Sequence, residues 1–275
     1  MRPFSLRFRR RRRLLAGLAL LAGVAVAAAV TATAGADPFL PSEDTLQSPS
    51  ARHPFGTDEL GRDILTRVLN GTWTALRIAI PPALVAAAIG TTVGLVAGYF
   101  GGIVDEILLR VIEFVLVVPR FLLALVVAAL FGADLWVVGA VLAATFWPHT
   151  ARLVRGETIS LREQPYVEAA RSLGAGHARV LTRHVLPLTL PVVAVNSSFQ
   201  AGQAVLIESG LAFLGLGDRD VVSWGSMLAD AQSYLALAWW TSVFPGLALG
   251  LFVVAVNLAG DGMADAWNVR STVRA

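Results

Sequence analysis

Residues 78–100 read IAIPPALVAAAIGTTVGLVAGYF, a run without a single charged side chain. A helix needs about 20 apolar residues to cross the hydrocarbon core of a bilayer, so this stretch predicts a transmembrane helix. Gly90, Gly94 and Gly98 recur at every fourth position of it. Small residues at that spacing let a second helix approach closely, and we therefore expect a membrane helix that packs against others.

The composition of the whole chain points to a membrane protein. Of its 275 residues, 56% are hydrophobic and 15% are charged, and the mean hydropathy is +0.67. These values are far from the averages of soluble domains. A chain of this length has room for about six spans plus loops. We expect an all-α polytopic membrane protein with six transmembrane helices.

Apolar and polar segments divide the chain into three regions. Residues 1–34 hold an arginine-rich tail and a first membrane helix over residues 14–30, for which a signal peptide is the alternative. Residues 35–73 form an extracytoplasmic linker. Its end, from Thr57 to about Thr74, is either a helix along the outer interface or one that merely leads into the next span. Residues 74–275 form the membrane core, with five spans expected at residues 78–100, 107–131, 135–150, 188–211 and 240–258.

The arginines predict the orientation of the chain in the membrane. A run from Arg9 to Arg13 precedes the first helix, and Arg152 and Arg155 follow the fourth. Positive residues flank membrane helices on the cytoplasmic side, so both termini are expected in the cytoplasm of a bacterial inner-membrane protein. The same arginine run favours lipid headgroups over nucleic acid as its contact. The segment 215–239 then lies outside and can dip back as a short helix.

The span at residues 107–131 carries charges and a proline. Arg110 and Glu113 stand three residues apart and can pair on one helix face. Pro119 and Arg120 follow in the middle of the apolar run, where a proline can kink a membrane helix.

All 22 basic residues are arginines, and the chain has neither lysine nor cysteine. A Walker-type phosphate loop needs its lysine, so this chain carries no ATP site of that kind. Schiff-base catalysis, thiolate metal sites and cysteine nucleophiles are excluded as well. The four histidines have no metal-ligand spacing. We expect no catalytic residue, metal or cofactor in this chain.

A polar loop at residues 161–187 separates the fourth and fifth spans. Pro165 suits the first turn of a short helix, and Gly174 suits its C-terminal cap. A second short helix, from about His177 to His184, should stop before Pro187. Helices this short need a packing partner. That partner is either a protein outside the membrane or the ends of the chain's own helix bundle.

One set of residues in this loop forms a recognisable pattern. Glu168 offers a carboxylate to a basic group, most naturally an arginine, and two alanines after it keep that side of the helix thin. The loop resembles the signature loop of ABC importer permeases, and the matching residues are Glu168, Ala169, Ala170, Gly174, Leu186 and Pro187. His184 stands where that pattern has an apolar residue, and Val185 beside it can fill the same pocket.

Other segments resemble the dipeptide, oligopeptide and nickel branch of these permeases. They are HPFGTDELGRD (residues 53–63), GLAFLGLG (210–217), SWGSMLAD (223–230) and DGMAD (261–265). The resemblance implies the second permease subunit of a heterodimer. It also implies two cytoplasmic ATPase subunits that bind ATP and Mg²⁺, and an extracytoplasmic substrate-binding protein. Peptides are the expected substrates, with nickel chelates, haem or another small solute as alternatives.

The same resemblance implies that the ATPases dock on the loop. The signature residues are joined there by Val167 and Leu173, which we expect to add apolar contact to the docked partner. ATP binding in the partner subunits would then drive alternating access, while this chain is no enzyme itself. A secondary transporter or channel subunit with a regulatory loop is the alternative from a different class.

Three amides mark the fifth span. Asn196, Gln200 and Gln203 fall at i, i+4 and i+7 and therefore share one helix face. Polar amides in hydrocarbon need partners or water. They either line a hydrated route for the substrate or bond to the sister permease. Glu208, about 120° around the helix, is expected in an outer gate or in a buried pair.

Overall fold

The computed structural model describes residues 22–23, 26, 29 and 37–272. The first membrane helix expected at residues 14–30, together with the arginine run before it, falls almost entirely outside this part of the chain. Within the described part the regular structure is helical, apart from an isolated β-bridge between Thr57 and Asp63. Four of its helices are long and apolar enough to cross a membrane, and a bent helix pair can supply a fifth span. The all-α class is therefore confirmed, and up to five of the six expected spans are accounted for.

Helix α2 (Ile64–Phe100) is the longest helix of the first half. The Asp63 carboxylate caps it by accepting a hydrogen bond from the Thr66 backbone N–H, 2.8 Å away. No separate interfacial helix precedes the span, because nothing between this cap and Pro81 interrupts the helix. The part of the chain from Thr57 to Asp63 is a loop. Of the two alternatives, a helix along the outer interface or one that leads into the span, α2 matches the second.

The expected span at residues 107–131 is two helices, α3 (Gly102–Val117) and α4 (Arg120–Phe131), which are bent by 67°. Pro119 causes the break, because it lacks a backbone N–H and pushes Val118 into an extended conformation. The expected pairing of Arg110 with Glu113 is wrong. Arg110 instead donates to Glu106, one turn earlier, at 2.9 Å.

Helix α5 (Leu135–Arg162) begins after the Asp134 cap and runs twelve residues beyond the expected end at Thr150. Two arginines hold this extension. Arg155 makes a two-armed ion pair with Asp105 of α3 at 2.5 and 2.6 Å, and Arg162 donates to the Gly98 carbonyl of α2 at 2.9 Å.

The glycine face predicted on α2 packs against α5, as the spacing indicated. A Cβ on Gly90 would come within 2.5 Å of the Trp147 carbonyl oxygen, and one on Gly94 within 2.5 Å of the Ala151 carbonyl oxygen. The two helix backbones therefore touch, and larger side chains cannot fit between them.

The loop after α5 holds α6 (Pro165–Ser172) and α7 (His177–Val180). A π-helical turn (Leu181–Val185) then joins α7 to α8 (Leu186–Phe213). The expectation that a short helix stops before Pro187 is wrong, because the π-helical turn just before this proline adjusts the backbone. Residues 177–213 instead form one continuous helical stretch.

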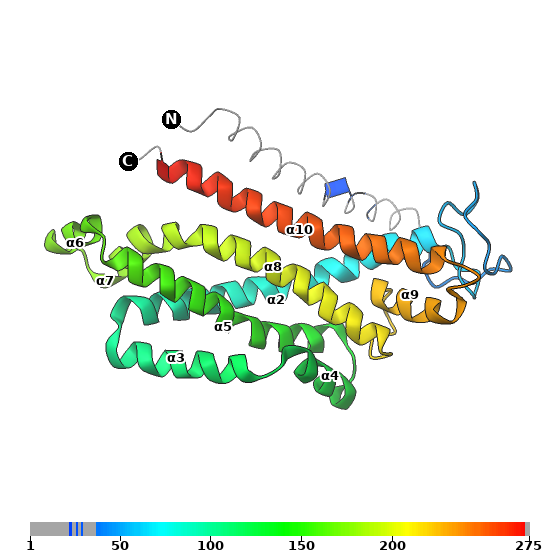
Figure 1. Cartoon of the computed structure of the whole chain (residues 1–275), viewed down its shortest axis with the longest axis horizontal. Coiled ribbons are helices and arrows are strands. Elements are labelled where there is room, and N and C mark those ends of the chain that lie inside the picture. Colours follow the sequence, from blue (N-terminus) through cyan, green and yellow to red (C-terminus); the bar gives the residue numbers. More distant parts are fainter. Residues whose placement is uncertain (1–21, 24–25, 27–28, 30–36, 273–275) are drawn as a thin grey trace.

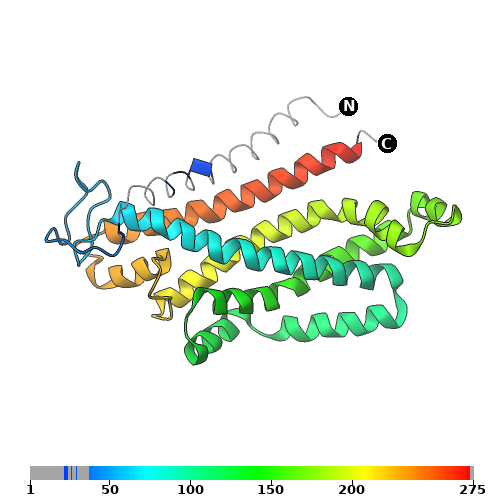
Figure 2. The same cartoon turned by 180° about the vertical axis from the view of Figure 1, so that it is seen from behind.

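Helix α9 (Trp224–Ala231) is the short helix expected in the outer segment, and α10 (Trp240–Thr272) is the last. Both views of the molecule show α2, α5, α8 and α10 running along its length (Figures 1 and 2). The α6–α7 hairpin projects at one end, and α9 and the loop after residue 37 lie at the opposite end. The core between the long helices is built on fully buried side chains such as Ile78, Leu142, Phe146, Val205 and Leu211.

Candidate functional site

The short helix expected between Pro165 and Gly174 is present as α6. Gln164 precedes it, Pro165 occupies its first turn, and Gly174 ends it in the left-handed region with φ +84°. The Ala175 backbone N–H donates back to the Ala170 carbonyl at 3.0 Å. Glycine is the residue that adopts this helix-ending conformation most cheaply, so the sequence signal and the geometry agree.

Buried valines anchor the hairpin to the bundle. Val167 of α6 is 0% exposed and packs with Val154, Val180 and Val185, which we call the valine cluster. Val167 therefore offers no surface to a partner, contrary to the expectation that it would add apolar contact there. Val185 is fully buried, whereas the neighbouring His184 is only half-buried.

An aromatic contact ties the hairpin to α2. The Arg171 guanidinium carbon lies 4.8 Å from the centre of the Tyr99 ring, and the Tyr99 hydroxyl lies 3.0 Å from His177 Nδ1. These three residues join α6, α2 and α7. Sequence reasoning missed this contact, since nothing in the spacing relates residue 99 to residues 171 and 177.

The outward side of the hairpin combines a carboxylate with an apolar side chain. Glu168 and Ala169 are exposed, Ala170 is half-buried, and Leu173 is 88% exposed. Among the described residues, Glu168 has no ion-pair partner within 4 Å. Leu186 and Pro187 lie farther along, in the first turn of α8, and only Pro187 is exposed. The hairpin thus presents Glu168 and Leu173 away from the bundle.

The amides of α8 bond to α5 of the same chain. Asn196 Nδ2 donates to the Thr150 hydroxyl at 2.8 Å, and Gln200 Nε2 donates to the Phe146 carbonyl at 2.9 Å and to the same hydroxyl at 3.2 Å. Gln200 is only 2% exposed. It therefore lines no open route in this structure, and its partner is α5 rather than a sister subunit. Gln203 is half-buried.

Glu208 is buried at the opposite end of α8, with 7% of its surface exposed. The Ser209 hydroxyl donates to its carboxylate at 3.3 Å. In the described part of the chain Glu208 takes part in no salt bridge, and its hydrogen-bond partner is this neighbouring hydroxyl group.

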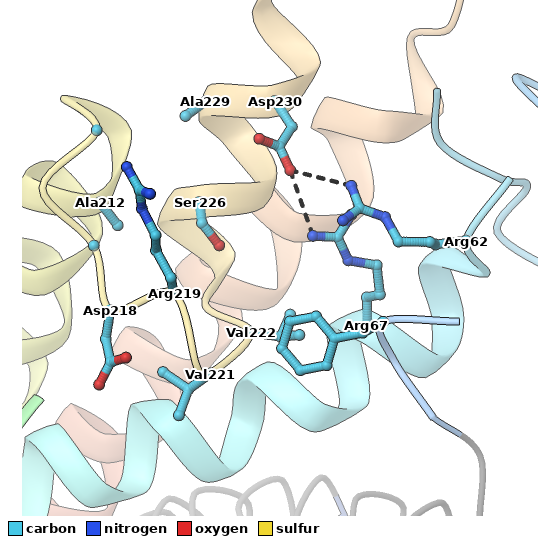
Figure 3. A pocket seen from close by; sticks show the side chains of 13 residues that line it. Arg62, Arg67, Ala212, Asp218, Arg219, Val221, Val222, Ser226, Ala229 and Asp230 are labelled. Carbon is cyan, nitrogen blue, oxygen red and sulfur yellow. Dashed lines mark hydrogen bonds and ion pairs between the residues drawn. The ribbon is translucent and has the colours of Figure 1, made fainter. Parts of the chain in front are cut away.

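A charged cleft of about 330 Å³ opens beside α9 (Figure 3). Arg62 and Arg67 both point to the Asp230 carboxylate at 3.4 Å, and both also pair with Asp58, Arg62 at 2.7 Å. Arg219 extends along the other wall of the cleft.

Sequence reasoning missed this cleft, because its two sides are far apart in the chain. The motif at residues 53–63 was the sequence signal for one side of the cleft, but nothing in it indicates Asp230 as the partner. Glu59 pairs with Arg62 at 3.0 Å. Burial raises the pKa of Glu59, while a backbone hydrogen bond and the Arg62 charge act in the opposite direction. Within the described part of the chain, no cluster of carboxylates and histidines has the geometry of a metal site.

Comparison with known proteins covers most of the chain. Residues 90–272 match the family described as binding-protein-dependent transport system inner membrane component. The glutathione transport system permease protein GsiD of Pectobacterium atrosepticum is 41% identical over 80% of this chain and 73% of its own length. The dipeptide transport system permease protein DppC of Alkalihalophilus pseudofirmus is 39% identical over 80% of this chain and 73% of its own length.

A third relative, a putative peptide transport system permease protein of Brucella suis, is 39% identical over 83% of this chain and 77% of its own length. Among solved structures, a chain of the inward-facing MetNI methionine ABC transporter superposes with a TM-score of 0.56. That match covers 73% of this chain and 96% of the other at 20% identity, which establishes a shared fold.

Proposed function

The chain belongs to the family of binding-protein-dependent transport system inner membrane components, and we propose that it is one of two permease subunits of an ATP-driven importer of peptides. It is a multi-pass protein of the inner membrane, and the family resemblance read from its motifs is confirmed. The names of its relatives, permeases for glutathione, dipeptides and other peptides, support the substrate class. Nickel chelates and haem are the alternative substrates.

The projecting hairpin carries the proposal for how ATP drives this subunit. Helix α6 stands at one end of the bundle (Figure 1), with Glu168 exposed and Leu173 almost fully exposed. An ATPase subunit that docks there can pair a basic group with Glu168 and cover Leu173. We place this end in the cytoplasm together with both termini. The cleft beside α9 then faces outward, toward the substrate-binding protein.

The size of the required free energy favours a docked helix over a single bond. Switching a two-state equilibrium from 1:99 to 99:1 needs about 5.5 kcal/mol of differential interaction. One hydrogen bond to a charged group contributes about 1.5–3 kcal/mol. Apolar contact at Leu173 must therefore add to Glu168. The valine cluster then transmits the movement, because it ties α6 to the ends of α5 and α8.

The second permease, the two ATPases with their ATP and Mg²⁺, and the binding protein complete the proposed complex. This chain supplies no lysine for a phosphate loop, so the energy source must be in another subunit. In the proposed heterodimer this chain is the second permease, paired with a related permease subunit. Its own contribution is the path and the docking surface, without a catalytic group.

Reconstitution tests the proposal. The two permeases, the ATPases and the binding protein are placed in proteoliposomes, and uptake of labelled di-, tri- and tetra-alanine is measured. We expect uptake that requires both ATP and the binding protein and that vanadate abolishes. Uptake without the ATPases, driven by an ion gradient, would show a secondary transporter instead. Uptake of a nickel chelate or haem in place of the peptides would reassign the substrate.

A further inference from the structure

Arg120 is a charged residue inside the membrane-spanning region for which the family assignment supplies no role. It is the first residue of α4, directly after the proline break that bends the α3–α4 pair by 67°. Its guanidinium carbon lies 5.4 Å from the centre of the Phe146 ring on α5. The side chain is half-buried between these helices.

The position of Phe146 gives the depth of Arg120. Phe146 follows the first residue of α5, Leu135, by eleven positions, which is about 16 Å along a helix that rises 1.5 Å per residue. The hydrocarbon core is about 30 Å thick. The guanidinium therefore lies near the middle of the bilayer, where a charge is expensive and marks a functional position.

No anion offsets this charge within the part of the chain that the structure describes. Two buried or half-buried arginines nearer the ends of the bundle are paired, Arg67 with Asp58 and Arg155 with Asp105. Arg120 has no carboxylate within 4 Å and no side-chain hydrogen bond among the described residues. The neighbouring ionisable group that its charge acts on, His149, is itself a base. An arginine stays protonated at any accessible pH, so the positive charge persists without a counter-ion.

We propose that Arg120 binds the C-terminal carboxylate of the peptide as it passes through the membrane, an inference that rests on the proposed function. The guanidinium presents N–H donors in a planar fork that fits a carboxylate with two parallel hydrogen bonds. The guanidinium carbon lies over the Phe146 ring, and such a cation–π contact does not use the N–H donors that a carboxylate would need. Helix α4 adds potential of the same sign, because Arg120 stands at its positive end.

The bend between α3 and α4 is what makes this position available. In a straight helix the side chain at residue 120 would share a face with residues one turn away on α3, which are all apolar. The break turns α4 away from α3 and brings Arg120 over Phe146, whose backbone carbonyl accepts from Gln200. Arg120 and the amide of Gln200 therefore contact the same residue of α5, one at its ring and the other at its backbone carbonyl.

Charge rescue tests the inference in the complete reconstituted transporter. Arg120→Cys is treated with methanethiosulfonate reagents that add an aminoethyl, a hydroxyethyl or a sulfonatoethyl group. The chain has no cysteine of its own, so the untreated and treated wild type report any effect on the other subunits. The probe is whichever of di-, tri- or tetra-alanine the wild type imports best.

We expect Arg120→Cys to lower uptake about tenfold or more, since hydrogen bonds to a charged group are lost. The positively charged aminoethyl group should restore most of it, and the neutral and negative groups should not. The C-terminal amide of the same peptide lacks the carboxylate. Its uptake should therefore be the same in Arg120→Cys and in the wild type. Arg110→Cys is the matched control, because Arg110 is an exposed arginine on α3 that pairs with Glu106, and its uptake should stay at the wild-type level.

Four results would overturn the inference. One is wild-type uptake by Arg120→Cys, and another is equal rescue by the hydroxyethyl group. A third is an equal loss of uptake for the peptide and for its amide. The fourth is weaker copurification of the sister permease with Arg120→Cys, which would show that an acidic residue of that subunit is the counter-ion. If the wild-type complex imports no alanine peptide at all, the proposed function is wrong, and the inference that rests on it is wrong as well. If the wild type imports and the variant matches it, only the inference fails.

Discussion

At the scale of single residues, polar side chains within the bundle fall into two kinds. Asn196 and Gln200 find partners on α5 and so hold two helices together. Arg120 finds none among the described residues. Spacing predicted that three amides share one face of α8, but it did not show that α5 would satisfy two of them. The difference depends on which helix lies opposite, and the spacing within one helix does not contain that information.

Replacing both bonded amides should reduce stability. In the double variant Asn196→Leu with Gln200→Leu, about 1–2 kcal/mol of stabilisation should be lost, given about 0.6 kcal/mol or more for each hydrogen bond between membrane helices. Thermal unfolding in detergent measures this as a lower Tm. Gln203→Leu is the control, since this residue is half-buried and should keep the wild-type Tm. A larger drop in the control than in the double variant would show that these bonds do not stabilise the fold.

Charge reversal at Glu168 tests the proposed docking surface. Glu168→Arg should lower peptide uptake at least tenfold, since two like charges facing each other across an interface cost several kcal/mol. Stimulation of ATP hydrolysis by the loaded binding protein should be lost as well, while the amount of inserted permease stays unchanged. Glu163→Arg is the matched control, because Glu163 is 70% exposed on the same loop but precedes α6. Normal coupling in Glu168→Arg would contradict docking at this residue.

At the scale of helices, the start or end of a helix could be predicted from the sequence where a local residue determines it. Pro165 and Gly174 bound α6, and Pro119 broke the third span at the position where a kink was expected. Predictions were wrong where a distant contact decides the outcome. Helix α5 continues past Thr150 because Arg155 reaches Asp105 on another helix. The helix after His177 continues past Pro187, because the π-helical turn adjusts the backbone just before that proline.

The turn at Gly174 gives a test at this scale. Gly174 has φ +84°, and a Cβ there would meet nothing within 4 Å, so a substitution acts through backbone strain alone. Gly174→Ala should destabilise the hairpin by about 1–2 kcal/mol. Amide hydrogen exchange over residues 165–173 should then become about tenfold faster. Gly176→Ala is the control, because Gly176 is equally open but has φ −67°, and equal exchange in both variants would rule out this role of the turn.

At the scale of the whole molecule, the two ends of the bundle are built differently. The α6–α7 end is held by apolar packing in the valine cluster. The α9 end is held by ion pairs and aromatic contacts, including Phe55 stacked on Phe244 at 4.0 Å. Composition predicted a membrane protein and the family resemblance implied the fold. The cleft at the α9 end stayed hidden, because Arg62 and Asp230 meet across 168 positions of sequence.

The orientation of the two ends can be measured by labelling. Leu60 near the α9 end and Leu173 on the hairpin are both exposed, and the chain has no cysteine to compete with one placed there. A maleimide that does not cross membranes should label Leu60→Cys in spheroplasts and Leu173→Cys in inside-out vesicles, since arginine-rich segments stay in the cytoplasm. The wild-type chain gives the background. The reverse pattern would invert the proposed topology.

The π-helical turn at Leu181–Val185 has a consequence for the direction in which the hairpin points. A π turn holds one residue more than an α turn, and each residue of an α-helix advances the chain by about 100° around the axis. Deleting Thr182, which is exposed, would convert the turn to a regular one. The hairpin would then swing by about that angle relative to α8, and Val180 would leave the valine cluster. The direction in which Glu168 and Leu173 point therefore depends on the number of residues in the π-helical turn as much as on their types.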